Sequence, residues 1–140
     1  MSDLDHAIAI AIKAHAGQVD KAGQPYVLHP LRVMLKFQSE DERIVAVMHD
    51  VVEDSEVTFY NLNKEGFSDK VVEAIECLTK RKNEDYESFI MRVSKNSIAK
   101  KIKIEDIRDN LDLTRLHKIT EKDLQRIEKY HRALQLLTNK

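Results

Sequence analysis

The stretch ERIVAVMHDVVED, residues 42–54, combines the apolar spacing of a buried helix with a run of polar side chains. Ile44, Met48 and Val51 recur at helical spacing, which predicts that this segment packs inside the protein. Its second half, HDVVED at residues 49–54, adds one imidazole and three carboxylates. Buried carboxylates without partners are costly, so the polar run predicts a site that holds a metal ion.

In one continuous helix, the polar side chains of this run would form a single stripe. His49 would lie one turn from Glu53, and Asp50 one turn from Asp54. Neighbouring His49 and Asp50 would point about 100° apart, so both reach one ion only if the helix is tilted. An adjacent His-Asp pair is common by chance, and further ligands from elsewhere in the chain are needed.

Two distant residues supply such ligands. His29 stands in VLHP at the start of the second expected helix, where it is either a ligand or a capping histidine. Asp106 lies on the Ile102 face of a later helix, so it is either exposed or buried against a cation. Glu105 points to another face and is the weaker candidate. Mixed His and Asp ligation suits Mn, Fe or Zn better than Ca.

Glu53 and Asp54 have a separate expected role. One turn beyond the ligands, they would hold a water beside the ion and move its proton. The alternative is a plain acidic helix end, which the helix dipole disfavours.

The scarcity of glycine and proline predicts an all-α fold in one domain, residues 1–140. Only three glycines and two prolines interrupt the 140 residues. Gly17 is expected to follow the first helix, Pro30 to stand in the first turn of the second, and Thr58 and Ser68 to cap later helices.

Composition excludes several functional classes. A net charge of −1 gives no general attraction for nucleic acid. No apolar run approaches the ~20 residues of a membrane span, the mean hydropathy is −0.47, and no basic leader is evident. The single cysteine, Cys77, excludes an internal disulfide and fits a cytoplasmic location. The oligomeric state is not indicated.

Several short sequence motifs, taken in order along the chain, resemble those of the hydrolase domain of the RelA/SpoT alarmone enzymes, within the HD metal-dependent phosphohydrolase superfamily. These motifs are AHAGQ (14–18), KAGQPYVLHPLRV (21–33), HDVVED (49–54), LTK (78–80) and KIKIEDIRDNL (101–111). The resemblance implies a compact multi-helix HD-domain bundle. The chain lacks the length for synthetase and regulatory domains, so we expect a stand-alone small alarmone hydrolase.

The resemblance also implies the chemistry. The reaction would remove the 3′ pyrophosphate of (p)ppGpp, giving GDP or GTP and pyrophosphate, with Mn²⁺ as the metal. The implied metal ligands are His29, His49, Asp50 and Asp106, the catalytic acidic pair is Glu53 and Asp54, and the substrate-binding residues are Lys21 and Asn110.

Asp20 departs from the family pattern, since many members have arginine there. A carboxylate at this position would repel phosphate, so a second hypothesis is an HD phosphohydrolase that acts on another nucleotide. A third hypothesis is a regulatory module that binds a nucleotide without hydrolysing it. Lys21, with Lys80 or Lys103, would neutralise a leaving pyrophosphate.

Overall fold

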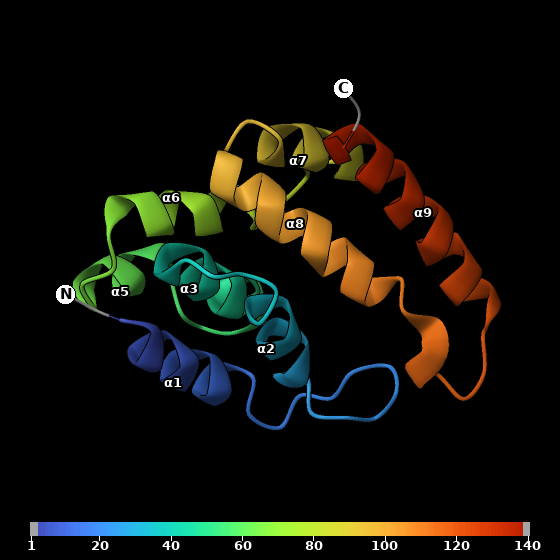
Figure 1. The fold of residues 1–140 in the computed structure, drawn as a ribbon, viewed down its shortest axis with the longest axis horizontal. Coiled ribbons are helices and arrows are strands. Elements are labelled where there is room, and N and C mark those ends of the chain that lie inside the picture. Colours follow the sequence, from blue (N-terminus) through green and yellow to red (C-terminus); the bar gives the residue numbers. More distant parts are fainter. Residues whose placement is uncertain (1–2, 139–140) are drawn as a thin grey trace.

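The computed structural model describes residues 3–138, which form helices joined by short loops (Figure 1). The helices are α1 (Leu4–Ala14), α2 (Leu28–Met34), α3 (Glu40–Met48), α4 (Val51–Asp54), α5 (Phe59–Lys64), α6 (Asp69–Cys77), α7 (Tyr86–Val93), α8 (Ser97–Asn110), the 3₁₀ turn η1 (Leu113–Arg115) and α9 (Glu121–Thr138). Within residues 3–138, β pairing is limited to one isolated bridge between Val19 and Pro25. The all-α prediction is confirmed.

Helix α3 forms the centre of the molecule. It packs against α1, α2, α6 and α8, and Val45, Val47 and Met48 are completely buried. Figure 1 shows α8 running diagonally past this centre, with α9 along its far side. In the described part of the chain, no helix is long and apolar enough to cross a membrane.

The predicted helix boundaries are largely confirmed. Thr58 caps α5 through a reciprocal pair of bonds with Asn61, and the Ser68 hydroxyl accepts the amide of Val71 at the start of α6. Pro30 stands in the first turn of α2. Gly17 follows α1 with a φ of 81°, a left-handed conformation that glycine adopts without strain. These signals act between residues that are close together in the sequence, which is why the sequence predicts them well.

The prediction of one continuous helix through HDVVED is wrong, because the chain breaks at His49 and Asp50. Helix α3 ends at Met48, and α4 begins at Val51. In an uninterrupted helix the carbonyl of Ala46 would accept the amide of Asp50; here it accepts the ring Nδ1–H of His49 at 2.6 Å. At this break the side chains of the two residues approach each other, with Nε2 of His49 3.1 Å from an oxygen of Asp50.

Candidate metal site and pocket

Two histidines and two aspartates converge at the centre of the fold. His29 comes from α2, His49 and Asp50 from the break between α3 and α4, and Asp106 from α8. Each offers one ligand atom, and these atoms lie within 4.8 Å of one another. His29, His49 and Asp106 are buried, and Asp50 is mostly buried. The structure therefore brings together all four predicted metal-ligating residues.

The atoms at the centre of this cluster are arranged to hold a cation. His49 donates its Nδ1–H to the Ala46 carbonyl, so its Nε2 is the nitrogen that faces the cluster. That Nε2 lies 3.1 Å from an oxygen of Asp50 and 3.3 Å from an oxygen of Asp106. These two carboxylates outweigh burial and raise the pKa of His49 well above its usual value, so without an ion Nε2 carries a proton, whose place a bound cation would take. The donor set of two imidazoles and two carboxylates fits a divalent transition metal.

Neighbouring side chains hold the two carboxylates in place. The hydroxyl of Tyr26 donates to Asp50 at 2.6 Å, and Lys103 donates to the outer oxygen of Asp106 at 2.8 Å. Asn110, one turn along α8, donates to the inner oxygen of Asp106 at 3.2 Å. Each carboxylate therefore keeps an oxygen directed at the centre of the cluster.

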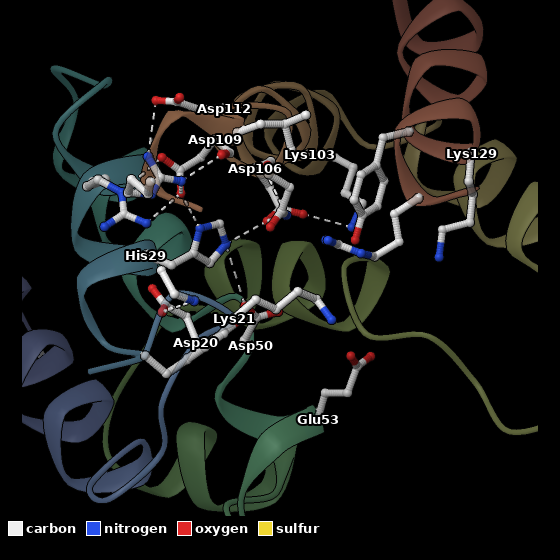
Figure 2. Close-up of a pocket in the computed structure, with 18 of the residues that line it drawn as sticks. Asp20, Lys21, His29, Asp50, Glu53, Lys103, Asp106, Asp109, Asp112 and Lys129 are labelled. Carbon is white, nitrogen blue, oxygen red and sulfur yellow. Dashed lines mark hydrogen bonds and ion pairs between the residues drawn. The ribbon is translucent and has the colours of Figure 1, made fainter. Parts of the chain in front are cut away.

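His29 is fixed from its other side by Asp109. Its Nδ1 lies 2.7 Å from Oδ2 of Asp109, while its Nε2 lies 2.7 Å from Asp106 (Figure 2). Arg32 donates a hydrogen bond to each oxygen of Asp109, both at 2.9 Å, and Arg115 forms an ion pair with Asp109 at 3.6 Å.

Sequence reasoning missed Tyr26, Arg32 and Asp109. A usable signal exists for two of them, because Arg32 lies three residues after His29 and Asp109 three after Asp106. That spacing puts each on the same helix face as a predicted ligand.

The pKa values at the cluster reflect its density of charge. Burial lowers the pKa of His29, but its hydrogen bonds to the carboxylates of Asp106 and Asp109 outweigh burial and raise that pKa to about 9. Burial disfavours the carboxylate of Asp50, yet the neighbouring His49 brings its pKa down to about 2. The environment thus favours ionised carboxylates that face positive charge.

The acidic pair lies at the edge of this cluster. Glu53 lines the pocket and accepts the backbone amide of Lys80 at 3.2 Å. Asp54 is not among the pocket-lining residues; burial, reinforced by the charges of Asp50 and Glu53, raises its pKa to about 6. The two carboxylates, adjacent in sequence, therefore occupy different environments.

A cleft of about 690 Å³ opens beside the cluster. Its wall toward α9 is basic and aromatic, and includes Lys80, Lys103, Arg126, Lys129, Tyr86 and Tyr130. Figure 2 shows Lys103 and Lys129 on this side, with Glu53 below. Burial and the nearby cations Lys103 and Arg126 lower the pKa of Lys129. Such a wall favours a polyanionic ligand.

The predicted substrate-binding residues both line this cleft. Lys21 reaches in from the loop before α2, and Asn110 lies at the end of α8. Asp20 also lines the cleft, but one oxygen of its carboxylate accepts the amides of Ala22 and Gln24, each at 2.9 Å. Asp20 therefore holds the turn of its own loop. Glu105 pairs with Arg108 and stays outside the cluster.

The chain is similar to proteins named guanosine-3′,5′-bis(diphosphate) 3′-pyrophosphohydrolase. No protein-family model matches the chain. The guanosine-3′,5′-bis(diphosphate) 3′-pyrophosphohydrolase of Aquifex aeolicus (strain VF5) is 29% identical over 121 residues, which cover 78% of this chain and 17% of that protein. The protein of the same name from Borreliella burgdorferi is 37% identical over 78 residues, covering 53% and 12%. The chain thus spans less than a fifth of the length of these relatives.

A solved structure, described as a metazoan ortholog of SpoT that hydrolyzes ppGpp and plays a role in starvation responses, superposes with a TM-score of 0.80. It is 25% identical, and the match covers 97% of this chain and 85% of that one. The fold is that of a SpoT-type alarmone hydrolase. The expected HD-domain bundle is confirmed, and three residues of the His/Asp cluster that could hold a metal, His29, Asp50 and Asp106, line the cleft.

Proposed function

We propose that the chain is a Mn²⁺-dependent hydrolase that removes the 3′ pyrophosphate of (p)ppGpp, giving GDP or GTP and pyrophosphate. The observation that carries the proposal is the convergence of two histidines and two aspartates on one point beside a basic cleft. The similar proteins are named as alarmone hydrolases, which supports the choice of substrate.

In this proposal the residues that hold the ion are His29, His49, Asp50 and Asp106. A bound divalent ion polarises a phosphoryl oxygen and makes water more acidic. Glu53 orients the attacking water from the edge of the cleft. Asp54, the next residue along the chain, would accept the proton of that water.

The basic wall of the cleft would bind the pyrophosphate. Lys103 already pairs with Asp106, so Lys80 and Lys129 are better placed than Lys103 to meet the leaving group. Lys21 and Asn110 would hold the ribose and base. A cytoplasmic location and a single domain over residues 1–140 stay predictions.

The test is an assay of pyrophosphate release from ppGpp with added Mn²⁺. We expect release by the unmodified protein, and a loss of at least about a hundredfold in His49→Ala and Asp50→Ala, since each removes a ligand. The exposed His117, changed to alanine, is the matched control and should retain activity. A protein that binds Mn²⁺ but releases no pyrophosphate would overturn the proposed substrate.

Hydrolysis of another nucleotide is the second candidate. Its support is that Asp20 is committed to its own turn and that Arg32 and Arg115 are paired with Asp109, so this end of the cleft has few cations for a 5′ diphosphate. A panel of nucleotides with 3′, 2′ or 5′ phosphates decides between the two. Nucleotide binding without turnover under any divalent metal would instead indicate the regulatory module.

A further inference from the structure

We infer that Asp109 is a positioning residue for the metal site: it holds the proton of His29 on Nδ1 and so directs the Nε2 lone pair at the ion. The inference rests on the proposed role of His29 as a metal ligand. It assigns a function to Asp109, a residue to which the resemblance gives no role.

The geometry around His29 allows few orientations of the ring. Its two nitrogens lie 2.7 Å from two different carboxylates, Asp109 on one side and Asp106 on the other. A metal ligand must present a lone pair, so one nitrogen must give up its proton when an ion binds. Asp106 is itself part of the cluster around the ion, whereas Asp109 is outside it. The proton that remains therefore belongs on the Asp109 side.

Asp109 is held firmly enough for this task. Arg32, on the same helix as His29, binds both of its oxygens with two bonds of 2.9 Å. This fork geometry fixes the plane of the carboxylate. The arginine also stabilises the ionised form of Asp109, because the guanidinium lies against both carboxylate oxygens.

His49 offers a comparison within the same site. Its Nδ1–H donates to a backbone carbonyl, that of Ala46, at 2.6 Å. Both histidines therefore present Nε2 to the cluster and give Nδ1 to an acceptor behind them. For His29 that acceptor is a charged side chain, which makes its imidazole a stronger donor to a cation than one held by a neutral carbonyl.

The first experiment measures Mn²⁺ affinity without nucleotide, from the electron paramagnetic resonance signal of the free ion. We expect Asp109→Ala to bind Mn²⁺ roughly 10–100-fold more weakly, and Asp109→Asn to fall between it and the unmodified protein because an amide oxygen still accepts the bond. Asp112→Ala is the matched control, because Asp112 pairs with Arg115 and Thr114 and does not contact His29. Its affinity should stay within about twofold.

Equal Mn²⁺ affinity in the Asp109 and Asp112 variants would overturn the inference. Each affinity is measured well below the unfolding midpoint of that variant, so that loss of folded protein does not contribute. An unmodified protein that fails to bind Mn²⁺ would instead refute the metal site itself, and with it the proposed function.

The second experiment does not depend on a variant that folds. Nuclear magnetic resonance of the ¹⁵N-labelled protein with Zn²⁺, a diamagnetic probe, reports which nitrogen of His29 carries the proton. We expect a slowly exchanging, strongly downfield proton on Nδ1. A proton on Nε2, with Nδ1 bound to the metal, would contradict the assigned role of Asp109.

Discussion

Glu53 and Asp54 are adjacent residues of the same type in unlike surroundings. Glu53 meets a backbone amide at the edge of the cleft. Asp54 is disfavoured as a carboxylate, because burial and the negative charges of Asp50 and Glu53 raise its pKa from 3.8 to about 6. The resemblance groups the two residues as one catalytic acidic pair, but in the structure their carboxylates have different surroundings.

The raised pKa of Asp54 predicts a specific dependence of stability on pH. Between pH 3.8 and about 6 the folded protein retains a proton on Asp54 that the unfolded chain has released. Stability therefore falls as the pH rises through this window, and the full cost is present above it. We expect Asp54→Asn to unfold roughly 2 °C higher than the unmodified protein at pH 7.5 without metal, a small gain because the side chain is only half-buried and solvent screens part of the repulsion.

Thermal unfolding followed by circular dichroism checks this expectation. The gain in unfolding temperature from Asp54→Asn should shrink toward pH 4. There the folded unmodified protein carries a protonated, neutral Asp54, as the variant carries a neutral asparagine. The gain should also disappear when Mn²⁺ is added, since a cation favours the carboxylate. A gain that is the same at every pH would show that the proton on Asp54 is not its cause.

Among the helices, α7 has a role in holding the rim of the cleft. Its Arg92 donates to both oxygens of Glu84 at 2.9 Å and to the carbonyl of Thr79 at 2.9 Å, and it also meets the last carbonyls of α6. The pKa of Glu84, lowered to about 2 by the hydrogen bond from Arg92, keeps this pair ionised well into acid. Arg92 thereby fixes the loop that carries Lys80.

Replacing Arg92 with lysine should loosen this loop, because an ammonium cannot reproduce the planar fork of five donors. We expect the amides of Arg81 and Glu84 to exchange with solvent about tenfold faster, as each takes part in a hydrogen bond within the loop. Hydrogen–deuterium exchange measures this. The control is Arg108→Lys, an exposed residue that pairs with Glu105; unchanged exchange in the Arg92 variant would mean that the loop is held by other contacts.

The elements of the fold were predictable to differing degrees. Caps such as Thr58 and Ser68 follow from local hydrogen bonding and were predicted correctly. The break at His49 was not predicted. It depends on the His49 side chain donating a hydrogen bond to a backbone carbonyl, and the helical spacing of apolar residues does not indicate such a bond. The convergence of His29 with Asp106 was predicted only from residue type and resemblance. Their approach depends on the packing of α8 against α2, and so does the contact of Asp109 with His29. The three-residue spacing from Asp106 puts Asp109 on the same helix face but does not indicate its partner.

At the scale of the whole molecule, α9 closes the basic side of the cleft by packing on α7 and α8. Leu137 is fully buried in this contact, whereas its neighbour Leu136 is 42% exposed. The helix thus depends on a narrow apolar face to keep Arg126 and Lys129 at the pocket wall.

Truncating that face should destabilise the protein. We expect Leu137→Ala to lower the free energy of unfolding by about 2–5 kcal/mol, the cost of lost burial plus a cavity. Leu136→Ala, the matched control, should change it by less than about 1 kcal/mol because that side chain already meets solvent. Urea unfolding of the two variants compares them directly, and similar losses would show that α9 does not dock as described.

The separation along the chain between the converging residues has a consequence for how the protein folds. His29 and Asp106 lie 77 positions apart, yet they meet at 2.7 Å. Contacts between such distant segments close a long loop, which makes them late and slow to form. We therefore expect the site to mature only after α8 has docked on α2. In a refolding experiment, recovery of the metal site should lag behind the recovery of helix content.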